Sequence, residues 1–304
     1  GFLSISGEYT DSEFTERAEQ YCTGGFCIND PSPAPGNANN VPGGLSDADI
    51  VNSERFQAAL PNASVEGDFV QPWGTPNLES TRLFYNAGYD FDNGVELYSF
   101  GNYSQSTGDG SFFYRFPGNS VLSDRRLADG TRWNPAFNDT GSGPSFPAGF
   151  TPRFEGEVTD YSALGGIRGS DEYGFSWDLS ARYGYNEIAY TLFNTYNPSL
   201  GPTSPTSFEP GTLSNQEIQI QLDMAQELDF GLTTPAIFAF GLSYLDEEYI
   251  VEETDDVASY EIGPWAVSDP FGFCDADAGT PTAAGAALDP AVGLDCANSS
   301  DPVY

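Results

Sequence analysis

The stretch WDLSARYGYNEIAY, from Trp177 to Tyr190, alternates two kinds of residue over an unusual length. Its odd positions begin with Trp, Leu, Ala, Tyr and Tyr, and its even positions begin with Asp, Ser, Arg, Gly and Asn. A period of two is that of a β-strand with one apolar and one polar face. Ordinary strands have about 5–6 residues, so the two faces of this strand must meet different surroundings over a long distance.

Seven segments share this strand-like character, and together they predict one all-β domain over residues 1–304. They lie near residues 2–9, 80–91, 95–104, 158–169, 174–194, 213–230 and 236–253. Helical periodicity is almost absent, because Gly or Pro interrupts most windows that could carry it. Asn93-Gly94, which separates two of the segments, is a strong hairpin signal. We therefore expect antiparallel hairpins.

Short turns and long polar loops alternate along the chain. The loops cover roughly residues 10–79, 105–157, 195–212 and 254–304. An up-and-down antiparallel sheet would place all short turns at one end and all long loops at the other, as transmembrane β-barrels do with their extracellular loops. Several segments reach the roughly 9–11 residues that a membrane-crossing strand needs. A soluble β-sandwich, whose apolar faces would pack together, fits the same alternation.

Aromatic residues near the strand ends favour the membrane reading. Tyr89, Tyr98, Tyr161 and Trp177 suit the aromatic girdles that flank the apolar band of such barrels. No window approaches 18 consecutive apolar residues, so we expect no transmembrane helix. No signal peptide is evident either, so an exported protein would be present here in a mature or truncated form.

The charge balance is extreme, with 45 acidic residues, ten basic residues and a net charge of −35. All ten basic residues are arginine, and lysine and histidine are both absent. Such a surface repels nucleic acid, because phosphate binding needs basic residues. The absence of histidine excludes a Ser/His/Asp triad and histidine metal ligands. The acidity fits solubility or a salty habitat, and it also allows Ca²⁺ binding in the loops.

The four cysteines predict two local disulfides in an oxidising compartment. Cys22 and Cys27 flank a Thr-Gly-Gly-Phe turn, and Cys274 and Cys296 lie in the last Gly- and Asp-rich segment. We expect the pairs Cys22–Cys27 and Cys274–Cys296. Four free thiols, or pairing between the two loops, remain open because sequence alone does not fix connectivity.

Several phrases resemble the β-barrel of TonB-dependent outer-membrane receptors. They include DYSALGGIRG, FSWDLSARYGYNEI and NPSLGPTSPTSFEPGTL, which follow one another between residues 160 and 213. LFYNAGYDFDNGVELYSFGNYS is similar to an early barrel hairpin of that family, and AIFAFGLSYLDEEYIVE with ASYEIGPWA is similar to a later strand and loop. The resemblance covers most of residues 1–266 and consists of order and spacing.

The resemblance implies a 22-stranded barrel around an N-terminal plug, reached by TonB through a TonB box. It implies energised uptake of a scarce ligand, namely siderophore-bound iron, cobalamin or an oligosaccharide, across the outer membrane of a Gram-negative bacterium. Neither a plug nor a TonB box is found in this sequence, and about seven strands are too few to close an even-numbered barrel. The expected partner is therefore outer-membrane lipid, with TonB reached only through the segments not found. The alternative is a structural subunit that joins its open strand edges into an extracellular polymer. An enzyme is not expected.

Candidate site residues fall into three groups. The loop tryptophans Trp73, Trp133 and Trp265 could stack on a ligand, although such residues more often pack loops together. Asp178, Arg182 and Asp223 are expected to form a polar network on the inner face. The acidic loop clusters could bind Ca²⁺ through Asp47, Asp49, Asp255, Asp256, Asp275 and Asp277, although none has the EF-hand pattern.

Overall fold

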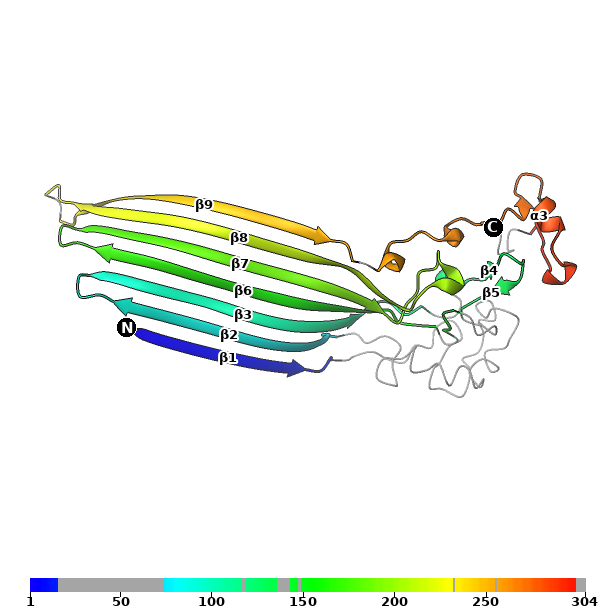
Figure 1. The fold of residues 1–304 in the computed structure, drawn as a ribbon, viewed down its shortest axis with the longest axis horizontal. Coiled ribbons are helices and arrows are strands. Elements are labelled where there is room, and N and C mark those ends of the chain that lie inside the picture. Colours follow the sequence, from blue (N-terminus) through cyan, green and yellow to red (C-terminus); the bar gives the residue numbers. More distant parts are fainter. Residues whose placement is uncertain are drawn as a thin grey trace.

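The chain folds into a long curved antiparallel sheet that carries a cluster of loops at one end (Figure 1). The computed structural model describes residues 1–15, 74–115, 119–135, 143–146, 149–231, 233–254 and 256–298. The prediction of an all-β chain with an antiparallel sheet of seven strands is confirmed. Within the described residues this sheet does not close into a barrel, because β1 and β9 each have a neighbour on one side only.

The sheet is a meander in which every strand pairs with the previous long strand. The strands are β1 (Phe2–Ser12), β2 (Asn77–Asp90), β3 (Val95–Ser111), β6 (Arg153–Ser170), β7 (Phe175–Phe193), β8 (Ser207–Leu228) and β9 (Ala236–Glu252), in that spatial order. The pairing register is continuous except for a bulge where β7 meets β8 between Tyr190 and Leu192. All seven predicted strands are therefore present in the predicted order.

The short turns gather at one end of the sheet and the long connections at the other, as predicted (Figure 1). Two of the turns end in a glycine with a positive φ, Gly94 at +78° and Gly174 at +82°. Glycine adopts this conformation without steric cost. The Asp171 side chain accepts from the backbone N–H groups of Tyr173 and Phe175 and so fixes the second of these turns.

The strands extend further into the loop end than the sequence predicted. β3 continues to Ser111 and β6 starts at Arg153, so parts of the predicted loop 105–157 are strand. β8 starts at Ser207, inside the predicted loop 195–212. These extensions are rich in Glu, Thr, Gly and Ser, so apolar and polar residues do not alternate in their sequence. The backbone pairing continues through them all the same.

The loop end contains short elements that the sequence did not predict. They are η3 (Ser120–Leu122), β4 (Arg125–Arg126), β5 (Arg132–Trp133), η4 (Gly201–Thr203), η5 (Val257–Ser259), η6 (Pro264–Ala266), β10 (Cys274–Asp275), β11 (Thr280–Pro281), α3 (Ala283–Ala286) and η7 (Pro290–Val292). The expectation that no strand follows residue 253 is wrong, since β10 and β11 pair after it. Among the described residues, no helix is long and apolar enough to span a membrane.

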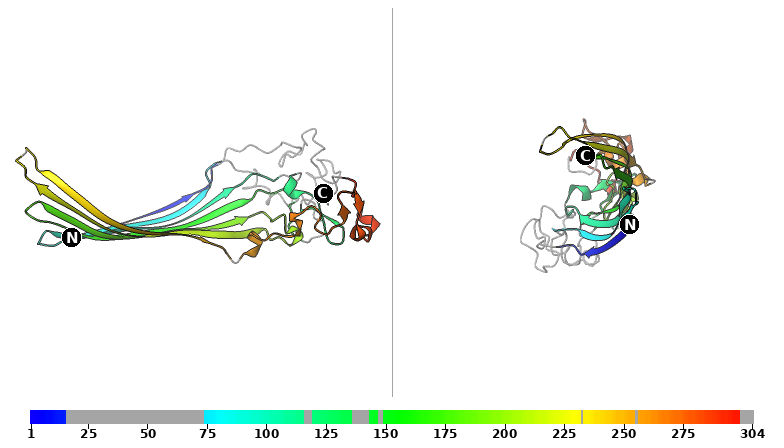
Figure 2. Two further views of the ribbon diagram at one scale, coloured as in Figure 1. Left: turned by 90° about the horizontal axis from the view of Figure 1, so that it is seen from above. Right: turned by 90° about the vertical axis from the view of Figure 1, so that its left-hand side faces the viewer.

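The sheet curves, so that one face is concave and the other convex (Figure 2). Exposure alternates along the central strand β7 in phase with its side-chain chemistry. Leu179, Ala181 and Tyr183 are exposed, whereas Asp178, Ser180 and Arg182, which alternate with them, are half-buried. Because side chains converge on the inside of a curved sheet and diverge on the outside, the polar residues lie on the concave face and the apolar residues on the convex face.

Candidate functional site

The convex face carries an exposed apolar band that runs from β1 to β9, with the small residues Ala163 and Gly165 where it passes β6. The cross-strand register places its members on one face, and each of those named here is at least 43% exposed: Leu3, Ile5, Leu83, Leu97, Leu179, Ile218, Ile220, Phe238, Phe240 and Leu242. Soluble monomers rarely expose contiguous apolar patches beyond a few hundred Å². A band of this extent therefore needs an apolar partner.

Aromatic side chains border the apolar band at both ends. At the loop end Tyr103, Tyr161 and Tyr185 lie side by side on three neighbouring strands, and the Tyr161 and Tyr185 ring centroids are 5.1 Å apart. At the turn end Tyr89 and Trp177 occupy convex positions of β2 and β7. Beyond the tyrosine row the convex face becomes acidic, with Asp11, Glu79, Glu157, Glu187 and Glu248. The outer surfaces of transmembrane β-barrels have the same order of apolar, aromatic and charged zones.

The height of the band matches a bilayer. On β7 it runs from Trp177 to Tyr185, which is roughly 27 Å of strand at about 3.4 Å per residue. A strand that is inclined by about 35° to the membrane normal would cover roughly 22 Å of height with this length, close to the ~25 Å band of outer-membrane barrels. The same height is not required of an interface with another protein.

The band is inclined to the strands, and this inclination can be derived from the register. On β9 it runs from Phe238 to Tyr244 and is centred on Gly241, which lies in register with Asp178 of β7. On β1 it runs from Leu3 to Tyr9 and is centred on Ser6, which lies in register with Gly184 of β7. The centre therefore moves six residues along the strands between β9 and β1.

This shift gives the tilt of the strands. Six residues correspond to roughly 20 Å along a strand, and the six spacings between β9 and β1 correspond to roughly 29 Å across the sheet. The ratio gives an angle of about 35° between the strands and the normal to the band, and closed barrels require about 35–45°. The residue pattern, taken together with the register, thus gives an inclination close to the range of strand tilts in closed barrels.

The concave face carries paired polar side chains at the depth of the apolar band. Arg168 forms a bidentate pair with Glu96, with Nε–Oε2 and Nη2–Oε1 distances of 2.7 and 2.9 Å. The Tyr98 hydroxyl donates to Asp178 over 2.6 Å, and Arg182 pairs with Glu217. Apolar side chains interrupt this face, among them Phe84, Phe100 and Leu164 on the inner strands and Ile237 and Leu245 on β9. The network suits a water-filled interior, because its charges are paired but not deeply buried.

The predicted inner-face residues Asp178, Arg182 and Asp223 do lie on this one face. Asp178 and Asp223 are directly opposite each other on β7 and β8, and Gln221 donates to Asp223 over 2.7 Å. Asp178 and Asp223 border an open hollow of about 660 Å³ at the turn end, which Glu96 and Arg168 also line. Tyr98, which the sequence suggested for an aromatic girdle, points to the concave face instead, because its position is one residue out of phase with the band.

The loops at the other end pack around a small core of their own, here called the cap core. Its members come from four separate segments and are Leu122, Trp133, Phe146, Phe150 and Tyr196, all at most 4% exposed. The Tyr196 ring lies 5.9 Å from both Phe146 and Phe150, and 6.4 Å from Trp133. Of the predicted ligand-stacking residues, Trp133 is therefore a buried packing residue. Trp73 lies outside the described residues.

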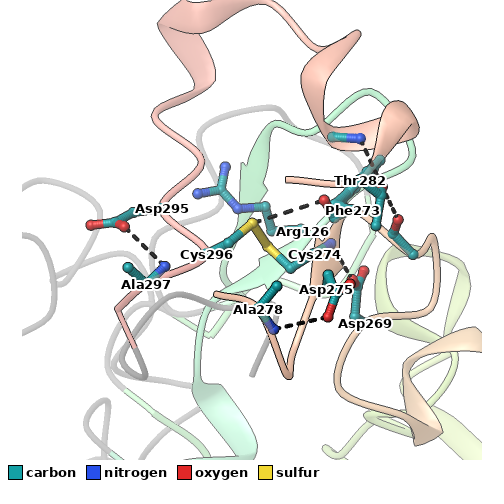
Figure 3. The surroundings of a disulfide bond; sticks show 12 residues. Arg126, Asp269, Phe273, Cys274, Asp275, Ala278, Thr282, Asp295, Cys296 and Ala297 are labelled. Carbon is teal, nitrogen blue, oxygen red and sulfur yellow. Dashed lines mark hydrogen bonds between the residues drawn. A yellow bond between two sulfur atoms is a disulfide. The ribbon is translucent and has the colours of Figure 1, made fainter. Parts of the chain in front are cut away.

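Arg126 joins the last loop to the cap, and a disulfide closes the last loop on itself (Figure 3). The Arg126 guanidinium is buried and donates to the carbonyl oxygens of Gly130, Val292 and Gly293 over 2.8, 2.8 and 2.9 Å. The indole N–H of the half-buried Trp265 donates to the Arg126 carbonyl oxygen over 2.8 Å and its ring lies edge-on to Phe271, so this residue helps to hold the last loop to the cap. Segments about 166 residues apart in sequence are thus fastened together.

The disulfide Cys274–Cys296 is formed, as predicted, and links residues 22 apart in sequence. Cys22 and Cys27 lie outside the described residues. Reducing the Cys274–Cys296 bond should destabilise the last loop by about 3 kcal/mol, because a loop of this length loses that much closure entropy in the unfolded chain when it is cross-linked. Hydrogen exchange of residues 264–298 before and after reduction measures the effect. Unchanged protection there would contradict it, and residues of β7 should be unaffected.

Tyr196 makes the cap sensitive to high pH. Burial raises the pKa of Tyr196 to about 12, from an ordinary value of 10.0, and its hydroxyl donates to the Val121 carbonyl oxygen. Between pH 10 and about 12 the folded cap keeps this proton while the unfolded chain releases it. We therefore expect the free energy of cap unfolding to fall by up to about 1.4 kcal/mol per pH unit in this window. Tyr196→Phe should remove that slope. A slope that persists in Tyr196→Phe would contradict the assignment.

The acidic loop residues do not form a metal site in the part of the chain that the structure describes, where no group of three or more carboxylate or thiol ligands converges. Asp256 accepts from the backbone N–H of Glu209, and Asp275 accepts from the N–H groups of Asp277 and Ala278. Asp47, Asp49 and Asp255 lie outside the described residues. The Ca²⁺ expectation stays a prediction.

Sequence reasoning missed the residues that assemble the cap and one partner of the inner network. Arg126 and Tyr196 lie outside the predicted strands, and Glu217 was not named among the inner-face residues, although all three make contacts that hold the structure together. Glu217 could have been found, because it lies on the polar face of β8 near Arg182 once the hairpin register is known. No local signal marks Arg126 or Tyr196.

Comparison of the chain with protein-family models, with curated proteins and with solved structures gives no match in any of the three. The functional argument therefore depends on the two faces of the sheet and on its loop cap.

Proposed function

We propose that this chain forms part of the wall of an outer-membrane β-barrel that takes up a scarce ligand, in the manner of TonB-dependent receptors. The observation that carries the proposal is the exposed apolar band on the convex face. The strands are inclined by about 35° to the normal of this band, as the strands of a barrel are inclined to the barrel axis. The aromatic borders of the band and the paired charges on the concave face support the same reading. The loops then lie outside the cell and the short turns face the periplasm.

The uptake role adds the sequence resemblance to this geometry. A curved wall with a hydrophilic inner face and a packed loop cap is suited to enclosing a polar pathway for a hydrophilic ligand such as siderophore-bound iron, cobalamin or an oligosaccharide. Energy from TonB would act through a plug and a TonB box, neither of which is evident in this sequence. The wall itself has no catalytic role in this proposal.

Uptake by cells tests the proposed function. Gram-negative cells that carry the protein should accumulate at least one labelled ligand among ferric siderophores, cobalamin and oligosaccharides faster than cells from which it is deleted. A protonophore should abolish the difference, because TonB-dependent uptake is energised. Equal accumulation of all three classes, or accumulation indifferent to the protonophore, would refute the transport role. This experiment tests uptake, and the insertion of the sheet into the membrane is tested by other measurements.

A further inference from the structure

The two edges of the sheet place strong conditions on what can pair with them. In the part of the chain that the structure describes, β1 and β9 are the outermost strands, and both run from the turn end to the loop end (Figure 1). In the proposed membrane seating, backbone N–H and C=O groups along an open edge within hydrocarbon would each cost several kcal/mol. An occupant of the β9 edge is therefore required wherever the apolar band meets lipid.

We propose that the β9 edge binds a β-strand that runs from the loop end to the turn end and carries basic residues near the loop end. The proposal rests on the proposed function in two respects, namely that the convex face meets lipid and that the loops of all strands lie on one side of the membrane. An antiparallel neighbour of β9 must then run in the opposite direction to β9. Its alternate residues on the convex side must be apolar, beside Phe238, Phe240 and Leu242.

The charge on β9 specifies the second condition. The loop-end half of this strand contains Asp246, Glu247, Glu248 and Glu252, and the strand contains no basic residue. On the β8 side these carboxylates meet only neutral donors or another carboxylate: Asn215 donates to Glu247 over 3.0 Å, and Gln216 donates to Glu248 over 2.6 Å. Like charges directly opposite destabilise a strand pair and opposite charges stabilise it. A strand with Lys or Arg near its loop end is therefore the complementary occupant.

A second copy of this chain does not meet these conditions. Joining β9 of one copy to β1 of another with all loops on one side would make a parallel pair, and it would bring the loop-end carboxylates Glu8 and Asp11 beside those of β9. Joining two like edges in antiparallel fashion would send the loops of the second copy to the opposite end of the sheet. Assembly of copies is therefore disfavoured by both direction and charge.

Synthetic strands in detergent micelles test the charge condition. Two 17-residue peptides of alternating Leu and Ser would differ only at two positions in the N-terminal third, which hold Lys in one and Glu in the other. We expect the Lys peptide to bind the full chain about tenfold more tightly, as expected for two charge pairs that change from repulsive to attractive. The double variant Glu247→Gln, Glu248→Gln should reduce this ratio to about threefold or less, because the carboxylates that discriminate are gone. Equal affinities for the unaltered chain would overturn the charge condition.

Cross-linking tests the direction. A cysteine near the N-terminus of the Lys peptide should form a disulfide with Val251→Cys and not with Ile237→Cys. These two positions lie at opposite ends of β9, share one face and are both 69% exposed, so they are matched controls. The reverse preference would overturn the antiparallel assignment, as would a cross-link between Val251→Cys of one chain and Asp11→Cys of another that outcompetes the peptide. Because the peptide experiments use micelles and the uptake experiment uses cells, the two proposals are tested separately. Either proposal can be refuted while the other stands.

Discussion

Replacing Leu222 with arginine is expected to destabilise the inserted sheet by about 2–4 kcal/mol, which is the cost of a lipid-facing Arg near the bilayer midplane. Leu222 lies on the convex face between Leu179 and Leu242, at the level of the apolar band. Chemical unfolding of the protein reconstituted in phosphatidylcholine vesicles would measure the change. Floatation of the vesicles would report whether the variant inserts at all.

Gln221→Arg is the matched control, because Gln221 is the neighbouring residue of the same strand and points to the concave face. Arginine there can reach Asp223, to which Gln221 already donates. We expect a change below about 1 kcal/mol, as for other partly exposed ion pairs. If the two variants were equally harmful, or if Gln221→Arg were the worse of the two, the lipid would not be meeting the convex face.

Trp133→Ala has the second largest expected effect, a loss of about 3–5 kcal/mol from the stability of the loop cap. Trp133 is 2% exposed and its ring contacts Tyr196, so its removal leaves a cavity between segments that pack together through the cap core. Hydrogen exchange of residues 119–135 and 195–204 would measure the loss. Vesicle insertion should be unchanged, because the sheet pairs its strands without this residue.

Ile262→Ala serves as the control for Trp133→Ala, since Ile262 lies in the same loop cluster and is 81% exposed. It should change cap stability by less than about 0.5 kcal/mol. A Trp133→Ala cap as protected as the unaltered one would show that the cap core does not organise the loops. A variant that no longer inserts would show instead that cap and sheet fold as a single unit.

The sequence was informative about the sheet because both of its physical signals are local. Alternation of side chains with period two depends only on neighbouring residues, and glycine turns such as Asp92-Asn93-Gly94 fix hairpins over a few residues. The predicted number of strands, their order and the position of the turns all follow from these signals. The alternation along β7 is also sufficient to separate Leu179 and Tyr183, on the convex face, from Asp178 and Arg182 on the concave face.

The strand ends and the bulge could not be predicted for an equally physical reason. The stretch Ser207-Phe208-Glu209-Pro210-Gly211 has the composition of a loop, yet it belongs to β8. Between Tyr190 and Leu192 the register shifts, and Gly211 adopts a φ of +149°, so the irregularity absorbs the proline. Proline is tolerated in strands at bulges, but which strand provides the bulge depends on the partner and not on the proline.

The cap was beyond sequence reasoning because its contacts are distant and have no period. Arg126 meets Val292, and Trp133 meets Tyr196, although the members of each pair are far apart in sequence and lie outside the long alternating strands. The loop tryptophans were suggested as ligand-stacking residues from their type alone. Burial, which decides between stacking on a ligand and packing a core, depends on the tertiary structure.

The inclination of the apolar band allows the most direct test of the central claim, that the convex face meets lipid as part of a tilted barrel wall. Nitroxide labels at Ile5, Leu242 and Asp246, placed one at a time, would be compared for depth in phosphatidylcholine vesicles from their accessibility to oxygen and to a water-soluble nickel complex. Ile5 and Asp246 lie in register across the sheet, whereas Ile5 and Leu242 lie near the centre of the band on their strands. The account predicts that Ile5 and Leu242 are equally deep and that Asp246 lies near the headgroups. Equal depths for Ile5 and Asp246, or free access of the nickel complex to all three, would contradict it.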